Sequence, residues 1–223
     1  MQFEHGARVR PLLQGGKQFL ARGRISADRG YRIMSKGRQG QFRIIGGQWR
    51  GRRLYFPDRG GVRPTPDRVR ETLFNWLGQA LAGQHFLDLF AGAGALGLEA
   101  LSRGAAGGCF VERDRRLVAA IRGHLETLGT SAPAKVVAGS LPGWLTTTQP
   151  TLCDLVFLDP PWDAGLHEPV LRGLVEGQCL HPRARIYVEW RDRAGVPELP
   201  EPLVWDRQSK AGEAGFGLAV RGN

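Results

Sequence analysis

The segment Phe86–Gly97, with the sequence FLDLFAGAGALG, restricts the fold of this chain more than any other feature. A short apolar run, typical of a buried β-strand, leads through a glycine-rich turn directly into an apolar stretch with helical spacing. Glycine at such a turn lets the backbone approach a ligand, and it lets the following helix pack closely on the strand. This pattern predicts an α/β fold with a parallel sheet.

The same alternation of strand and helix continues toward the C-terminal end. Further strands are predicted over residues 109–111, 135–137, 155–158 and 185–189, and helices over 95–102 and 114–128. Residues 203–210 and 216–220 are expected to form a hairpin around Gly212–Gly215. Repeated β-α units predict a doubly wound, Rossmann-like, mostly parallel sheet, to which the hairpin adds an antiparallel edge.

The N-terminal part of the chain has a different character. Residues 1–41 are rich in Gly, Arg and Gln without a sustained period, so we expect a disordered basic extension, in which Met34 is a candidate for the true start. Residues 42–83 are predicted to form a small appendage. It consists of a β-hairpin over 42–45 and 53–56, followed by a helix that Thr65 and Pro66 begin. Residues 84–223 form the main domain.

Positive charge is concentrated in this N-terminal part. The net charge is +10, yet residues 1–70 carry 17 lysines and arginines against 4 acidic residues, while residues 71–223 carry 14 against 17. Such an asymmetry indicates a nucleic-acid-binding segment that precedes a domain of ordinary charge. Arginines here would contact phosphates and exposed aromatic side chains would stack on bases, whereas we expect Phe56 and Tyr55 in the hairpin core. The expected nucleic-acid contacts are Arg50, Arg52, Arg63, Arg68 and Trp49.

Several classes of protein are excluded by what the sequence lacks. No apolar run approaches the roughly 18–20 residues that a membrane span requires, and the N-terminus lacks the apolar core of a secretory signal. Cys109, Cys153 and Cys179 are far apart and form no CxxC motif. This argues against a disulfide framework or a metal site and fits a reducing compartment. We therefore expect a cytoplasmic monomer that uses neither a metal nor a membrane.

Two carboxylates narrow the choice of ligand for the glycine loop. Gly92, Gly94 and Gly97 satisfy GxGxxG, so a dinucleotide dehydrogenase must be weighed here. Asp88 ends the predicted strand. Its negative charge would repel a pyrophosphate, whereas its carboxylate oxygens would accept hydrogen bonds from the amino-acid end of a cationic sulfonium cofactor. Glu112 follows the next strand, 20 positions after Gly92. That spacing suits the ribose hydroxyls of either cofactor.

The tetrapeptide Asp159–Trp162, with the sequence DPPW, directly follows the predicted strand 155–158. Because doubly wound sheets bind ligands at the carboxyl ends of their strands, this loop is expected at the ligand crevice. The Asp159 carboxylate and the Pro160 carbonyl are suited to accept both N–H groups of an aryl amine and to aim its lone pair at a methyl donor. Trp162 offers a face for an unstacked base. A dehydrogenase has no role for these residues, so they favour methyl transfer from S-adenosylmethionine.

Together these motifs resemble one known family. Arg43–Arg52, Arg63–Leu77, Asp88–Leu101, Val111–Glu112 and Asp159–Trp162 are similar to segments of the RsmD-type guanine-N2 methyltransferases of bacterial small-subunit ribosomal RNA. The resemblance extends over residues 41–221. It implies a class I methyltransferase fold in the main domain, S-adenosylmethionine as cofactor, and methylation of the N2 amine of a guanine. The implied partner is 16S ribosomal RNA or the assembling small subunit.

The resemblance also carries roles for single residues. The expected cofactor contacts are Asp88, Phe90, Ala91, Gly92, Gly94, Glu112, Arg113, Ser140, Leu141, Thr65 and Arg70. Thr65 and Arg70 lie in the segment that is expected to close over the cofactor, and Arg70 or Arg68 then pairs with the cofactor carboxylate. Two positions depart from the family. Ser140 and Leu141 stand where Asp or Asn often contacts the adenine, and Trp162 replaces the more common Phe or Tyr.

Two alternatives stay open at this stage. The DPPW loop would also suit adenine N6 of DNA or RNA, or a glutamine amide of a protein, and only the N-terminal motifs speak against these substrates. The chain could instead be a non-catalytic RNA-binding assembly factor that has kept a cofactor pocket. The presence of both Asp159 and Glu112 argues against that reading.

Overall fold

The computed structural model describes residues 39–58, 63–78, 80–148, 150 and 152–222. They belong to one compact unit, Ser35–Asn223. Most of the predicted basic extension, with Met34, lies outside the described residues. Its last three positions, 39–41, are part of a strand. This first described strand therefore begins earlier than the sequence pattern indicates, because pairing with a partner strand extends it.

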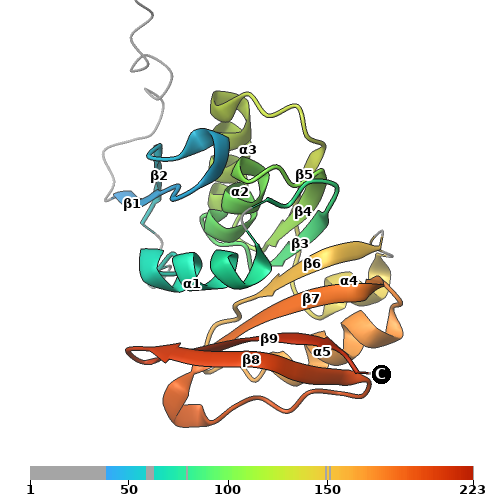
Figure 1. Ribbon diagram of the computed structural model, residues 1–223. Coiled ribbons are helices and arrows are strands. Elements are labelled where there is room, and N and C mark those ends of the chain that lie inside the picture. Colours follow the sequence, from blue (N-terminus) through green and yellow to red (C-terminus); the bar gives the residue numbers. More distant parts are fainter. Residues whose placement is uncertain (1–38, 59–62, 79, 149, 151, 223) are drawn as a thin grey trace, which may run out of the picture. The chain divides into compact units, whose positions relative to one another are not determined.

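A seven-stranded sheet forms the centre, with the strand order β5-β4-β3-β6-β7-β9-β8 (Figure 1). Its strands are β3 (His85–Leu89), β4 (Gly107–Glu112), β5 (Ala134–Ala138), β6 (Cys153–Leu158), β7 (Leu180–Arg191), β8 (Leu203–Ala211) and β9 (Ala214–Arg221). Strands β3 to β7 pair in parallel, and β9 lies antiparallel between β7 and β8. The predicted doubly wound sheet with an antiparallel C-terminal hairpin is confirmed.

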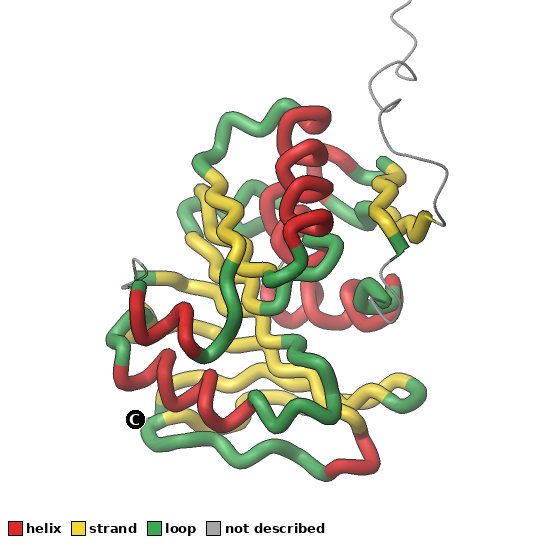
Figure 2. The backbone as a smooth tube through the Cα atoms, turned by 180° about the vertical axis from the view of Figure 1, so that it is seen from behind, coloured by secondary structure: helices red, strands yellow, loops and turns green. Residues whose placement is uncertain are grey.

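Helices cover both faces of this sheet (Figures 1 and 2). They are α1 (Asp67–Leu77), α2 (Ala95–Ser102), α3 (Arg115–Leu128), α4 (Gly143–Thr147) and α5 (His167–Glu176), with a short 3-10 turn at Asp192–Ala194. Residues of α1, α2 and α3 share one core with Phe86, Phe110 and Phe157, whereas α4 and α5 pack against the alternate strand residues Val156 and Ile186. Each strand is therefore apolar on both sides, as expected for buried parallel strands.

The N-terminal appendage is a hairpin that packs on the α2 and α3 side. Strands β1 (Gln39–Arg43) and β2 (Arg53–Pro57) pair antiparallel, with a 3-10 turn at Gly47–Trp49 between them. Phe56 and Ile44 are buried in the same core as the aromatic residues of the sheet. The following helix begins at Asp67, with Pro66 at the N-cap position. Pro66 thus precedes the helix rather than opening it.

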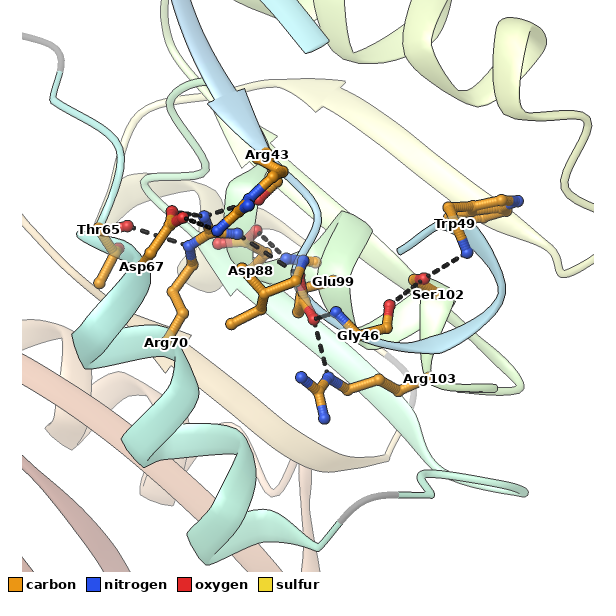
Figure 3. Close-up of polar contacts among 12 residues, drawn as sticks. Arg43, Gly46, Trp49, Thr65, Asp67, Arg70, Asp88, Glu99, Ser102 and Arg103 are labelled. Atoms are coloured by element: carbon orange, nitrogen blue, oxygen red, sulfur yellow. Dashed lines mark hydrogen bonds and ion pairs between the residues drawn. The ribbon is translucent and has the colours of Figure 1, made fainter. Parts of the chain in front are cut away.

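One buried carboxylate holds the hairpin to the main domain (Figure 3). Glu99 of α2 accepts hydrogen bonds from the backbone amides of Ile45 and Gly46, at 2.8 and 2.7 Å. It also forms ion pairs with Arg70 at 3.4 Å and with Arg103 at 2.8 Å. We call these five residues the Glu99 cluster. The cluster joins α1, α2 and the hairpin, which fixes the loop before α1 above the carboxyl ends of the strands.

Candidate active site

Four acidic residues lie at the carboxyl ends of four neighbouring strands. They are Glu112 of β4, Asp88 of β3, Asp159 directly after β6 and Glu189 of β7. Leu158 pairs with Val188, so Asp159 and Glu189 follow at the same level. Because side chains alternate along a strand, both share the side of Phe157 and Tyr187, which face α1 to α3. These four acids extend across the position between β3 and β6 where the strand order reverses. Sheets of this kind usually bind their ligands in the crevice at that position.

The chain leaves β3 through a turn that requires glycine. Phe90, Gly92 and Gly94 have φ angles of 60°, 54° and 80°, a left-handed region in which glycine carries little steric cost. Gly97 has another purpose. A β-carbon there would lie 2.3 Å from the ring of Phe110, so α2 packs closely against the sheet. The GxGxxG pattern thus contains two turn glycines and one packing glycine.

Glu112 is fixed by the backbone of this region. Its Oε2 accepts from the Gly92 amide and its Oε1 from the Asp114 amide, each at 2.8 Å. A carboxylate oxygen can accept more than one hydrogen bond, so lone pairs remain for two neighbouring ribose hydroxyls. The glycine turn and Glu112 together fit the nucleoside part of S-adenosylmethionine.

Asp88 lies beneath the same turn, 3% exposed, and its Oδ2 accepts from the Gly97 amide at 2.9 Å. Burial raises the pKa of Asp88 to about 7; the Gly97 hydrogen bond opposes this effect, and the charge of Glu112 adds to it. A nearby cation would favour the ionised form of such a carboxyl group. The crevice is therefore suited to a cationic ligand, as a sulfonium cofactor with an ammonium group is.

The buried Thr65 side chain, in the loop before α1, lies near Asp159, and its hydroxyl stabilises the ionised form of that carboxyl group as a hydrogen-bond donor. Burial, followed by the charges of Glu189 and Asp88, raises the pKa of Asp159 well above its usual range, and the Thr65 hydrogen bond partly opposes this. Such a group is a stronger proton acceptor once it is ionised. Pro160, the next residue, is buried.

Trp162 completes the loop and is half-buried. The Arg191 guanidinium carbon lies 5.7 Å from the centre of the indole ring, a cation–π distance that orients the ring. Arg191 also approaches Asp163 at 3.8 Å and Glu213 at 3.9 Å. The DPPW loop is therefore tied to the end of β7 and to the hairpin of β8 and β9.

Arg70 is placed differently from what the sequence indicates. Its side chain is 1% exposed, and its guanidinium donates to the carbonyl oxygens of Thr65 at 3.0 Å and Arg43 at 2.8 Å as well as to Glu99. These contacts occupy the group that was expected to bind the cofactor carboxylate. Arg70 instead positions the loop that carries Thr65, and the exposed Arg68 is left as the candidate for the cofactor carboxylate.

Three other predicted cofactor contacts lie at the edge of the crevice. Arg113, which follows β4, is exposed. Ser140 and Leu141, which follow β5, are exposed and half-buried in that order. The Gly139 amide donates to the Glu112 carbonyl at 3.0 Å, which brings the end of β5 beside the end of β4. The roles of these residues stay predictions.

The predicted RNA surface is partly corrected. Arg50, Arg52, Arg63 and Arg68 are all exposed. Trp49 is not available for stacking on a base, because it is 7% exposed and belongs to the core of the hairpin and α2. Tyr55 is 41% exposed, although it was expected in the hairpin core. On β2 the buried positions are Leu54 and Phe56, so the alternation of the strand turns Tyr55 outward.

Glu189 and Tyr187 were not identified from the sequence as residues of the site. The Tyr187 hydroxyl donates to Glu189 Oε2 at 2.6 Å, and both side chains are buried. Burial raises the pKa of Glu189, and the hydrogen bond from Tyr187 lowers it. A usable signal was present, because Glu189 is an acid at the end of the predicted strand 185–189, just as Asp88 and Glu112 are acids near the ends of their strands.

Two absences apply to the described residues only. Within residues 39–222, apart from the gaps given above, no group of His, Cys, Asp and Glu side chains is arranged to hold a metal ion. In the same part of the chain no helix is long and apolar enough to cross a membrane.

The fold and the acidic crevice define a class I, S-adenosylmethionine-dependent methyltransferase. Comparison with known proteins agrees with this class and narrows it. The chain belongs to the family described as conserved hypothetical protein 95, the RsmD-type family, whose model matches residues 42–219. The resemblance expected from the sequence motifs is thereby confirmed.

Individual relatives cover most of the chain. It is 45% identical over 182 residues to the Escherichia coli (strain K12) protein named ribosomal RNA small subunit methyltransferase D, covering 82% of this chain and 91% of that protein. It is 34% identical to the Bacillus subtilis putative rRNA methyltransferase YlbH, covering 79% and 97%. The solved structure of the putative methyltransferase yhhF from Escherichia coli superimposes with a TM-score of 0.75 at 43% identity, covering 82% and 99%.

Proposed function

We propose that this protein transfers a methyl group from S-adenosylmethionine to the exocyclic N2 amine of a guanine in small-subunit ribosomal RNA. The printed names of the Escherichia coli and Bacillus subtilis relatives support RNA as the substrate. The observation that carries the proposed chemistry is the position of Asp159. It ends a central strand at the crevice, accepts from Thr65, and precedes Pro160 and Trp162.

The chemistry requires positioning more than a strong base. S-adenosylmethionine supplies an electrophilic methyl carbon on a sulfonium sulfur. An aryl amine is a weak nucleophile because its lone pair is conjugated into the ring. Asp159 and the Pro160 carbonyl would accept its two N–H groups and hold the nitrogen pyramidal, with the lone pair directed away from both oxygens. As the N–C bond forms, the bond between the methyl carbon and the sulfonium sulfur would break, with its electron pair staying on sulfur in a neutral thioether that leaves. The proton that the methylated nitrogen then loses would pass to Asp159.

Trp162 and the exposed arginines would bind the RNA. A base must leave its helix to reach Asp159, and the half-buried indole offers it a stacking surface worth about 1–3 kcal/mol. Arg50, Arg52 and Arg63 would contact phosphates without reading sequence. Arg68 would either join them or pair with the cofactor carboxylate. Because the substrate would be a ribosomal RNA, we place the reaction in the cytoplasm, and we expect a monomer.

The decisive experiment identifies the modified nucleoside. The protein is incubated with methyl-labelled S-adenosylmethionine and either naked 16S ribosomal RNA, small ribosomal subunits or DNA, and each product is digested to nucleosides. We expect label in N2-methylguanosine from RNA or subunits and none from DNA. Label in N6-methyladenosine would contradict the guanine assignment. Cofactor binding without label in any of the three substrates would favour a non-catalytic assembly factor.

A further inference from the structure

Glu189 lies beside Asp159 on the side of the crevice away from the glycine turn. The strand order β4-β3-β6-β7 places the cofactor loop over β3 and β4, Asp159 after β6, and Glu189 on β7. The pairing of Leu158 with Val188 brings the two acids to the same level. If a purine base presents its exocyclic amine to Asp159, the ring nitrogen beside that amine would therefore lie near Glu189.

One oxygen of Glu189 is held and the other is open. Oε2 accepts from the Tyr187 hydroxyl at 2.6 Å. No described residue donates to Oε1. A fully buried oxygen without a donor would be unsatisfied, and Oε1 is not one of the unsatisfied buried atoms in the described part of the chain. This oxygen therefore stays accessible although the residue is 4% exposed. The carboxylate is oriented by a fixed donor and keeps an acceptor free.

The purine edges differ at the atom beside the amine. Guanine has an N1–H donor next to its N2 amine, whereas adenine has a bare N1 acceptor next to its N6 amine. An ionised carboxylate accepts hydrogen bonds and cannot donate them. It would pair with N1–H and would leave a bare N1 facing a negative charge in a buried site, where an unmatched polar contact is costly.

We propose that the Glu189 carboxylate accepts the N1–H of the target guanine while Asp159 accepts the N2–H, so that the pair selects guanine over adenine. This rests on the proposed function and specifies which residue reads the base. Tyr187 is a positioning residue in this arrangement, because it acts through Glu189 and does not touch the base.

The test uses 2-aminopurine, which carries the same N2 amine as guanine but a bare N1. The methylated guanine is first mapped in the labelled RNA, and 2-aminopurine is then placed at that position of small-subunit RNA by ligation. We expect the unaltered protein to prefer guanine by roughly 10- to 100-fold in kcat/KM. In Glu189→Gln the side-chain amide can donate to N1. The guanine rate should therefore fall about 10-fold or more, and the preference should narrow by a similar factor.

Control variants separate recognition from folding. Glu168→Gln makes the same chemical change at an exposed position of α5 and should leave the preference unaltered. Tyr187→Phe removes the donor to Oε2 and so favours the protonated form of Glu189. It should lower the rate, and the preference for guanine should persist at a pH high enough to keep Glu189 ionised. Cofactor titration and thermal unfolding of each variant verify that the pocket is intact.

The outcomes are distinguishable. Equal guanine preference in the unaltered protein and in Glu189→Gln would overturn the inference while leaving the proposed function standing. Equal rates on guanine and 2-aminopurine in the unaltered protein would also overturn it, even if Glu189→Gln failed to fold. Formation of N6-methyladenosine would defeat the proposed function itself.

Discussion

The guanidinium of Arg70 lies 3.4 Å from the carboxylate of Glu99, and both side chains are almost completely buried (Figure 3). The two residues are 29 positions apart in the chain. Their contact closes the Glu99 cluster, through which α2 holds the hairpin and the loop of Thr65. The position of a site residue thus depends on a buried ion pair behind it.

Removing the Glu99 carboxylate should destabilise the protein strongly. Glu99→Ala removes the carboxylate that the Ile45 and Gly46 amides donate to, and it takes away the buried negative charge that pairs with Arg70 and Arg103. Loss of one partner of a buried charge cluster costs about 3–5 kcal/mol. Urea unfolding followed by circular dichroism measures the free energy of unfolding. Glu168→Ala, which breaks the exposed pair with Arg172, should cost less than about 1 kcal/mol, and an equally small loss for Glu99→Ala would contradict the assigned role.

Cofactor affinity should rise with pH through the titration of Asp88. The folded-state pKa is raised to about 7 from 3.8, so Asp88 is largely protonated at pH 6 and largely ionised at pH 8. A cationic ligand binds the ionised form, so binding at about pH 6 should release a proton. Calorimetry in buffers of different ionisation enthalpy measures that proton.

Asp88→Asn provides the comparison for this titration. The amide keeps an oxygen for the Gly97 N–H but cannot ionise, so its affinity should be lower at about pH 7.5 and nearly independent of pH below that value. Titration of the cofactor's own groups is the same for both proteins and cancels in the comparison. Identical pH profiles for the two proteins would show that Asp88 does not bind the cation.

Asp159 and Thr65 should affect turnover rather than cofactor binding. Asp159→Ala is expected to abolish methyl transfer while the affinity for S-adenosylmethionine stays nearly unchanged. Thr65→Val removes the hydrogen bond that favours the ionised form of Asp159. It should lower kcat and move the acid limb of the pH–rate profile to higher pH, because the pKa of Asp159 rises further. Thr65→Ser keeps the hydroxyl and should keep the profile; a profile unaltered in Thr65→Val would remove Thr65 from this role.

The exposed arginines of the hairpin should bind RNA through phosphates. Replacing Arg50 and Arg52 with Ala should weaken RNA binding and reduce the slope of log K against log salt by about 0.7 for each lost contact with single-stranded RNA. Cofactor affinity should be unaffected. The matched control is Arg172→Ala, an exposed arginine of α5 on the opposite face of the sheet, which should leave the slope unaltered. A slope unaffected by loss of Arg50 and Arg52 would exclude them from the RNA surface.

The architecture and the acidic residues of the crevice follow largely from patterns that are local in the sequence. Apolar runs that end in an acid, followed by a glycine turn or by two prolines, are local patterns. They placed Asp88, Glu112 and Asp159 at strand ends without knowledge of the strand order. Local patterning also predicted α3, where Asp114 caps the first turn and Gly129 takes the left-handed conformation at the end.

Which side chains are available to a ligand depends on packing between distant segments of the chain. From the sequence alone, Arg70, Trp49 and Tyr55 could each have been a ligand contact or a packing residue. Yet Arg70 is bound by Glu99, Trp49 lies in the core and Tyr55 faces outward. The role of Glu189 likewise depends on β7 pairing with β6 in one register. Burial and register arise from contacts between segments distant in the chain, and local periodicity carries no information about those contacts.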